Sequence, residues 1–306
     1  MAELSHRPLR ELIEGFGGCD EYFTEMISAG ALVGSGPFES FYIDGGPCPE
    51  KLVYQLVASD PGHLAAAAAI LDRLECLGID INMGCSAPAI TRTGAGVRWM
   101  ASPDKAAAMI ARVRAATQKR LSVKLRTGME DNFDYLVEFC RRLEAEGVER
   151  ITLHPRTGRE KFTGKARWDY VSRLRLELGI PVAGNGDIAC PEDLVHRAES
   201  GYCDAVMAGR AAVRAPWLFA VAKGASGDID LEDVGLRFLE FLSKYQPPEF
   251  HISRARRFFN YFCDNLKWGT YVKNLLNRET ELSGVTKTWS AYFGERPEER
   301  SAKLER

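Results

Sequence analysis

Short apolar runs alternate along the chain with longer stretches whose apolar residues recur at helical spacing. The runs predict strands at residues 31–36, 52–58, 79–83, 121–125, 150–153, 182–184 and 205–208. The stretches between them predict helices at residues 9–15, 63–77, 104–117, 133–146, 168–178 and 192–200. Because such alternation is typical of parallel strands joined by crossover helices, we predict an α/β protein.

The number of these elements favours a TIM-type (β/α)8 barrel whose first strand is lacking or truncated. Seven strands are visible in the sequence, whereas a closed barrel of this class has eight. The absent strand would precede the helix at residues 9–15, where only eight residues are available. Either the natural chain begins further upstream or the strand has been lost. We favour an upstream start, because a lost strand would leave two sheet edges unpaired.

The last part of the chain has a different pattern. Residues 225–228 mark a change in composition, and apolar residues then recur at helical spacing in residues 231–245, 253–266 and 270–277. We therefore predict two domains, a barrel over residues 1–224 and a small helical bundle over residues 229–306.

Composition narrows the class of protein. Hydrophobic residues make up 45% of the 306 residues, which is enough for a substantial core. No apolar run is long enough to cross a membrane, and the first residues lack the apolar centre of a signal peptide. The eight cysteines include no Cys-x-x-Cys pair, which argues against a zinc site. We expect a cytoplasmic monomer with reduced cysteines and no metal.

Charge gives only a weak indication of a partner. The net charge is −2, which does not suggest a nucleic-acid-binding protein. From residue 251 to the end, however, the chain contains eleven Lys or Arg residues and seven Asp or Glu residues. A modestly basic tail of this kind is compatible with RNA contact but is more often a solvated surface.

Most predicted strands end in a polar or reactive side chain. Cys85 follows one such strand, and a cysteine there, taken alone, is as often a small buried hydrophobe as a reactive group. The series of strand ends favours function, because the carboxyl ends of parallel strands share one face where catalytic groups collect. The residues of this series are Gln55, Asn82, Cys85, Lys124, His154, Asn185, Asp187 and Arg210.

Five motifs in order carry a resemblance to a known family. They are Asn82-Met83-Gly84-Cys85, Lys124-Leu125-Arg126-Thr127-Gly128, His154-Pro155-Arg156-Thr157, Asn185-Gly186-Asp187-Ile188 and Gly209-Arg210-Ala211-Ala212. Together they resemble the flavin-dependent tRNA-dihydrouridine synthases over nearly the whole chain. The resemblance implies tightly bound FMN, NADPH as the reductant and tRNA as the substrate.

The resemblance also implies which residues hold the cofactor. Met1 matches the end of a family strand, ending in Ala-Pro-Met, whose backbone touches the flavin, and Lys124 would stabilise the negative charge of the reduced ring. The residue pattern agrees for Lys124, since a lysine within an apolar strand needs an anionic partner. The other implied ring contacts are Gln55 and His154, and the implied phosphate contacts are Asn185, Gly186, Asp187, Gly209 and Arg210.

Cys85 matches the family's general acid. A thiol suits that task because it is acidic enough to give a proton yet mostly protonated at neutral pH. Asn82 and Arg156 would contact the uracil base and its phosphate. Ser86 stands where the family usually has proline, with Pro88 further on, so we expect a looser loop after Cys85.

The helical region would supply the tRNA contacts. Its second helical stretch interleaves arginines with aromatic residues. We expect the rings to form the core of the bundle, because aromatic residues mostly bury themselves. We expect the charged side chains of Arg254, Arg256, Arg257 and Lys273 to contact tRNA.

Two other interpretations stay open. A flavin barrel reductase acting on a small molecule, such as a dihydroorotate dehydrogenase, would share the phosphate site and Lys124, and activity on free pyrimidines would favour it. A tRNA-binding factor without catalysis would bind tRNA but no flavin. The sequence does not indicate which tRNA uridine is modified.

Overall fold

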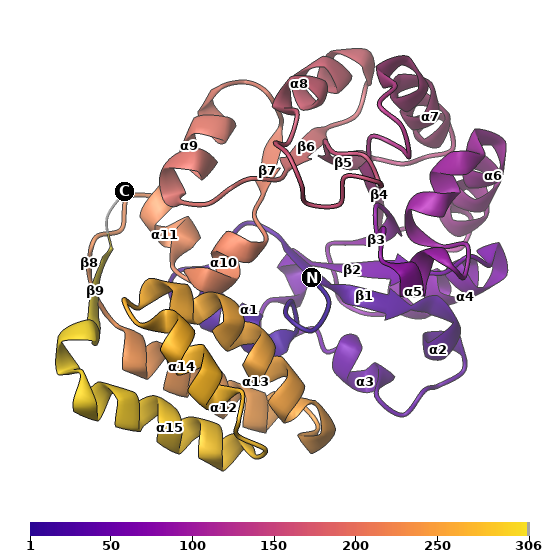
Figure 1. The fold of residues 1–306 in the computed structure, drawn as a ribbon. Helices are drawn as coiled ribbons and strands as arrows, with labels where there is room; N and C mark the ends of the chain where they lie inside the picture. The colour runs from indigo at the N-terminus through magenta and orange to yellow at the C-terminus, as the bar shows by residue number, and fades with distance from the viewer. Residues whose placement is uncertain (305–306) are drawn as a thin grey trace.

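The computed structural model describes residues 1–304, and its main sheet has seven parallel strands that pair in chain order (Figure 1). This sheet curls, with helices on its outer side, and confirms the predicted TIM-type architecture with seven strands present. The strands are β1 (Tyr22–Ser28), β2 (Leu52–Val57), β3 (Gly78–Met83), β4 (Arg120–Arg126), β5 (Arg150–His154), β6 (Val182–Asn185) and β7 (Ala205–Met207).

The strands are covered on both faces. Every residue of β2 and β3 is buried, which explains why these strands read as near-continuous apolar runs. Along β3, Ile79 and Ile81 belong to the apolar core, whereas Asp80 and Asn82 alternate with them on the inner side of the sheet. Polar side chains that could take part in chemistry therefore lie on the inner side of the curled sheet.

Helices follow most strands and begin at recognisable caps. Asp60 accepts a hydrogen bond from the His63 N–H before α4, and Asn132 accepts one from the Tyr135 N–H before α7. The helices of this part are α1 (Arg7–Glu14), α2 (Ala29–Val33), α3 (Glu39–Tyr42), α4 (Pro61–Asp72), α5 (Pro88–Thr91), α6 (Pro103–Arg114), α7 (Phe133–Ala145), α8 (Trp168–Glu177), α9 (Pro191–Glu199), α10 (Arg210–Arg214) and α11 (Leu218–Ala222).

One predicted strand is wrong. Residues 31–36 were expected to form a strand, but the strand of this region, β1, lies earlier in the chain and ends at Ser28. The residues that follow it form α2. Ser28 ends β1 and caps α2, since its hydroxyl accepts a hydrogen bond from the Ala31 N–H at 3.4 Å. The apolar run after Ser28 was too short for periodicity to separate strand from helix.

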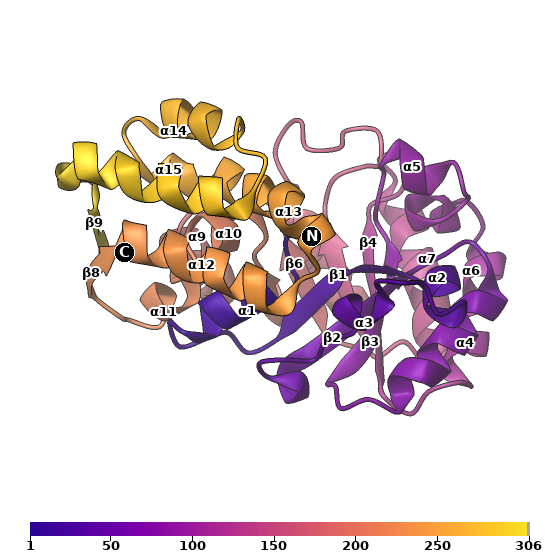
Figure 2. The same cartoon turned by 90° about the horizontal axis from the view of Figure 1, so that it is seen from below.

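The sheet has two open ends, at β1 and β7. Within residues 1–304 these two strands do not pair with each other, as expected for a barrel that lacks one strand. The N-terminus lies in this region, beside α13 (Pro248–Phe262), in both views (Figures 1 and 2). There the backbone N–H of Glu3 donates to the buried carboxylate of Glu25 on β1.

The C-terminal region is helical, as predicted, and contains more than was predicted. It comprises α12 (Leu231–Tyr245), α13, α14 (Gly269–Leu276) and α15 (Leu282–Glu295), of which α15 was missed. A two-stranded antiparallel sheet of β8 (Gly227–Asp230) and β9 (Ser301–Leu304), also missed, joins the two ends of the region. The final residues of the predicted domain, 305 and 306, lie outside the described residues.

The rings of Phe258, Phe259 and Phe262 are buried, as predicted for the core of the bundle, whereas Trp268 is 47% exposed. Phe238 and Phe258 stack with centroids 3.7 Å apart, and Trp289 donates from Nε1 to the Glu232 carbonyl at 3.0 Å. This apolar cluster is continuous with that of the barrel, and α12 packs against α1. The predicted division at residues 225–228 falls at the start of β8 and stays a prediction.

Three further observations concern residues 1–304. All eight cysteines are free thiols. No three His, Cys, Asp or Glu side chains converge as a metal ion would require. None of the helices is both long and apolar enough to span a bilayer.

Candidate active site

Cys85 lies in a turn that is fixed from two sides. The side-chain oxygen of Asn82 accepts hydrogen bonds from the N–H groups of Gly84 and Cys85, at 3.2 and 2.9 Å. The Cys85 carbonyl accepts one from the Val97 N–H at 3.0 Å. Gly96 has φ +62°, and a Cβ there would lie 2.4 Å from the Cys85 carbonyl oxygen. Only glycine permits this approach, so the loop after the turn holds the half-buried thiol in place.

A chain of hydrogen bonds continues from this turn into the interior. Asn82 donates from Nδ2 to Gln55 Oε1 at 3.0 Å, and Gln55 donates from Nε2 to Asp80 Oδ2 at 2.8 Å. The hydroxyl of Ser122 donates to the other Asp80 oxygen at 2.7 Å. Burial raises the pKa of Asp80 to about 6. Gln55 and Asn82, predicted as ligand contacts, therefore already bond to each other.

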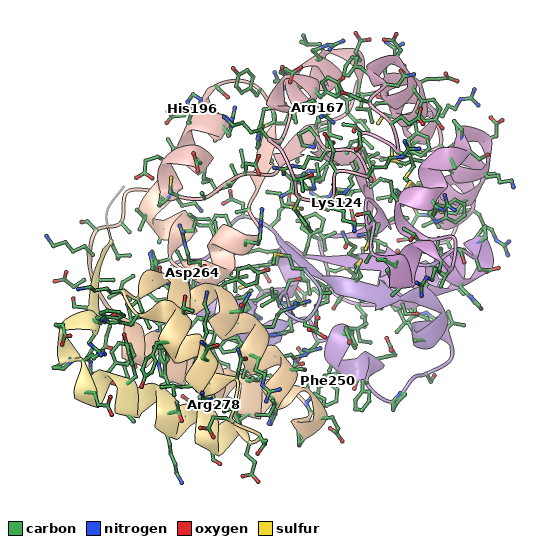
Figure 3. The ribbon with its side chains drawn as sticks, in the orientation of Figure 1. Lys124, Arg167, His196, Phe250, Asp264 and Arg278 are labelled. Carbon is green, nitrogen blue, oxygen red and sulfur yellow. The ribbon has the colours of Figure 1, made fainter. Side chains whose placement is uncertain are left out.

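Lys124 follows Ser122 on the inner side of β4, level with Asn82 on β3 (Figure 3). Within residues 1–304 its ammonium has neither a hydrogen-bond partner nor an ion pair. Burial lowers the pKa of Lys124 to about 8, although the carboxylate of Asp80 acts in the opposite direction. Such a group is costly unless an anion joins it.

His154 ends β5 and is 7% exposed. Arg156 donates from a guanidinium nitrogen to His154 Nε2 at 3.1 Å, so the ring proton is on Nδ1. Burial and the positive charges of Lys124, Arg126, Arg156 and Arg210 lower the pKa of His154 to about 2. The imidazole is thus neutral and surrounded by four cations.

Arg126 and Arg156 hold the loops around the site. Arg126 donates to the carbonyls of Gly84 and Lys161, at 3.0 and 2.7 Å. Arg156 donates to the Gly164 carbonyl at 2.6 Å and to both Asp187 oxygens, at 2.7 and 2.8 Å. Arg156 was predicted to contact an RNA phosphate, but it is 2% exposed and bonded within the protein. These bonds tie Arg156 to the loop after β5 and to Asp187, and its contact with an RNA phosphate stays a prediction.

Two residues of the site were missed. Arg126 lies two positions after Lys124 on the same strand, so period-two alternation would have found it. Phe162 is 65% exposed on the loop between β5 and α8, with its ring 6.2 Å from that of His154. The guanidinium groups of Arg126 and Arg210 lie 5.5 and 5.3 Å from its centroid. The signal for Phe162 in the sequence is an aromatic residue within a polar loop.

The predicted phosphate contacts lie at the ends of β6 and β7. Gly186 has φ +128°, and a Cβ there would lie 3.0 Å from His154 Cδ2, so this approach requires glycine. Asn185 donates to the Met207 carbonyl at 2.8 Å, and the Asp187 side chain is bonded to Arg156 and the Ala166 N–H. These two side chains therefore fix the local backbone.

Gly209 and Arg210 lie at the start of α10, and Arg210 is exposed. A Cβ built on Gly209 would lie 3.1 Å from Met1 Sδ, so Met1 and Gly209 are neighbours. The structure thus brings Met1 close to the end of β7, and its predicted contact with the flavin stays a prediction.

The arginines predicted to contact tRNA have partners within the protein. Arg254 is 2% exposed and forms a 3.0 Å ion pair with Glu25, so it faces the barrel and not the solvent. Arg256 donates to the Glu279 carbonyl at 2.8 Å, Arg257 lies 3.4 Å from the Glu3 carboxylate, and Lys273 pairs with Asp264. Of these, Arg257 is the most exposed, at 49%.

Known proteins resemble this chain in sequence. A probable tRNA-dihydrouridine synthase of Aquifex aeolicus is 32% identical, over 72% of this chain and 69% of that protein. The tRNA-dihydrouridine synthase B of Klebsiella pneumoniae is 34% identical, over 72% of this chain and 68% of that protein. The tRNA-dihydrouridine(16) synthase of Ralstonia nicotianae is 33% identical, over 69% of this chain and 67% of that protein.

Structural comparison supports the fold alone. A histamine dehydrogenase from Rhizobium sp. 4-9 superposes with a TM-score of 0.53 over 72% of this chain and 43% of that one, at 13% identity. The family model described as dihydrouridine synthase (Dus) matches residues 1–285, which include the barrel and most of the helical region. This chain therefore belongs to the dihydrouridine synthase family of tRNA-modifying, flavin-dependent oxidoreductases.

Proposed function

We propose that this chain binds FMN and, with NADPH as the reductant, reduces the carbon–carbon double bond of a uracil in tRNA, with Cys85 as the proton donor. The observation that carries the proposal is the half-buried ammonium of Lys124, which has no hydrogen-bond or ion-pair partner among residues 1–304 and lies next to Asn82 of the Cys85 turn. Family membership supports the reaction class.

The residues present fit a flavin. Lys124 would meet the negative charge of the ring, which removes the cost of burying an isolated ammonium. Three further cations, Arg126, Arg156 and Arg210, surround neutral His154 and favour an anionic ligand. At the far end, the backbone near Gly186 and Gly209, together with the exposed Arg210, would hold the phosphate.

The flavin supplies, when bound, a hydride taken from NADPH for one carbon of the uracil double bond. Cys85 breaks its S–H bond and gives the proton to the neighbouring carbon, and solvent returns a proton to the thiolate. Asn82 holds the backbone of Cys85, so the thiol is offered from a fixed turn. The products are dihydrouridine and NADP⁺.

The substrate base must leave the RNA fold to reach this site. The exposed ring of Phe162, with the exposed Arg210 beside it, would form the rim through which it enters. For the RNA backbone we propose Arg257 together with Arg92 and Arg98, which flank a cleft of about 210 Å³ beside Ser86. Both Arg92 and Arg98 are exposed and form no ion pair with any residue between 1 and 304.

The two alternative interpretations receive less support. The family match extends through most of the helical region, which a reductase of free pyrimidines would not need. A tRNA-binding factor without catalysis would have no use for the arrangement of Cys85, Lys124 and His154.

The test is a visible absorption spectrum of the purified protein, followed by an assay with tRNA lacking dihydrouridine. We expect a stoichiometric FMN band and NADPH-dependent formation of dihydrouridine. Cys85→Ala should keep the flavin and lose turnover by roughly 10²-fold or more, and Cys85→Ser should retain little activity. A colourless protein, or an unimpaired Cys85→Ala variant, would overturn the proposal.

A further inference from the structure

Asp80 is a buried carboxylate that the proposed reaction does not use. It lies on β3 beneath the site, and its hydrogen bonds within residues 1–304 come from two uncharged side chains, those of Gln55 and Ser122. We propose that Asp80 is a positioning residue for Cys85 and acts through the side-chain amides of Gln55 and Asn82. The inference rests on the proposed function, in which Cys85 donates the proton.

The direction of each hydrogen bond carries the argument. An ionised carboxylate only accepts, so Gln55 must turn its NH2 group towards Asp80 and its oxygen towards Asn82. Asn82 must then turn its own NH2 group towards Gln55. Its oxygen is left facing the N–H groups of Gly84 and Cys85, as observed. One carboxylate thus sets the orientation of two amides and the acceptor that holds the Cys85 backbone.

Rotating either amide would break this order. With Gln55 reversed, its oxygen would face the Asp80 carboxylate and its NH2 group would face that of Asn82. Water cannot compensate, because Asp80, Gln55 and Asn82 are 0, 6 and 7% exposed. The arrangement therefore has a single low-energy state while Asp80 is ionised.

This arrangement of hydrogen bonds keeps the Cys85 thiol in position. The Asn82 oxygen holds the N–H of Cys85 at 2.9 Å, and without it the turn after β3 loses the side-chain acceptor on that side. A displacement of about 1 Å at a reacting group can cost roughly 10²-fold in rate. A proton donor is sensitive to such a shift, whereas transfer of hydride from NADPH to the flavin does not involve the thiol.

The test compares Asp80→Ala, which removes the acceptor, with Ser122→Ala, which removes the other hydrogen bond to the same carboxylate. For Asp80→Ala we expect tRNA reduction to slow about ten-fold or more, with flavin reduction by NADPH within about two-fold of wild type. We expect Ser122→Ala to lose less activity than Asp80→Ala, because the Asp80 carboxylate and its hydrogen bond to Gln55 remain. Asp80→Asn, which keeps the shape and one acceptor oxygen, should lie between them and serves if Asp80→Ala does not fold.

A second readout does not depend on turnover. Iodoacetamide should alkylate Cys85 several-fold faster in Asp80→Ala than in wild type, with Cys48, remote from the site, as the internal reference. In the Asn82→Ala background, Asp80→Ala should add little further loss, because both changes act on one path. Unchanged alkylation, or losses that multiply in the double variant, would overturn the inference. A wild-type enzyme inactive on tRNA would overturn the proposed function, while the alkylation result would still decide the role of Asp80.

Discussion

At the scale of single residues, the site rests on two charges of opposite sign, the buried carboxylate of Asp80 and the half-buried ammonium of Lys124. Burial lowers the pKa of Lys124 to about 8 and raises that of Asp80 to about 6, so both remain charged at pH 7. Lys124 has no partner among residues 1–304, whereas Asp80 has two hydrogen bonds. The ammonium is therefore the group that gains most from an anionic ligand.

Replacing Lys124 should reveal the free-energy cost of withdrawing its ammonium from water. The pKa of Lys124 is about 8 in the folded protein, whereas in the unfolded chain it has the ordinary value of 10.5. The cost of burying the ammonium is thus fully present below pH 8 and disappears as the pH rises towards 10.5. Lys124→Met should raise the unfolding free energy of the flavin-free protein at pH 7 by about 1–3 kcal/mol, since the ammonium is only half-buried, and weaken FMN binding about ten-fold or more.

Urea unfolding at pH 7 and pH 10, with FMN titration at pH 7, checks this expectation. The gain in stability should shrink at the higher pH. A variant that is less stable at pH 7, or that binds FMN as tightly as wild type, would show that Lys124 is not an isolated ammonium awaiting an anion.

At the scale of elements, the sequence located most strands and helices because their ends carry strong signals. Polar residues after β3 and β5, and caps such as Asp60 and Asn132, mark boundaries locally. The strand at residues 31–36 was misplaced because the short apolar run after the cap at Ser28 fits either a strand or a helix. The β8–β9 pair was missed although Asp230 caps the helix that follows β8. The two strands of that pair are distant in the sequence and are defined only by each other.

The site was predicted less completely than the fold, for the same reason. Motifs identified Cys85, Lys124 and His154, because each follows or lies within a recognisable strand. They did not reveal that Arg254 would be buried, since its partner, Glu25, lies more than two hundred residues earlier in the chain. Whether an arginine faces RNA or another element depends on tertiary packing.

The Glu25–Arg254 pair joins α13 to the edge strand β1, and breaking it should destabilise the protein. Arg254→Met leaves a buried carboxylate without its cation, so we expect a loss of about 3–5 kcal/mol in unfolding free energy. Adding Glu25→Gln should restore most of it, because the carboxamide can still accept from the Glu3 N–H. Chemical denaturation of the single and double variants checks this. A stable Arg254→Met protein with weakened tRNA binding would instead support the role first predicted for Arg254.

At the scale of the whole molecule, exposed positive charge lies beside the site as well as on the helical region. Arg254, Arg256 and Lys273 bond within the protein, whereas Arg92 and Arg98 are exposed beside the Cys85 loop. A chain with net charge −2 can thus present a local basic surface to RNA.

Removing Arg92 and Arg98 should weaken tRNA binding without altering the chemistry. The double variant Arg92→Gln/Arg98→Gln should raise the Kd for tRNA about ten-fold and reduce the slope of log K against log salt by about one unit per lost phosphate contact. Arg73→Gln is the matched control, since Arg73 is exposed after α4, at the opposite end of the strands. Binding across a salt series measures both quantities, and equal slopes in the two proteins would exclude the proposed contacts.

The open ends of the main sheet have a consequence for how the chain folds. In the sheet formed by residues 1–304, every strand pairs only with its neighbour in the chain, from β1 to β7. A closed barrel must in addition pair its last strand with its first, across nearly the whole domain, at a further cost in loop-closure entropy. Here each new strand adds to an edge that already exists, so the sheet can grow in the order in which the ribosome delivers it.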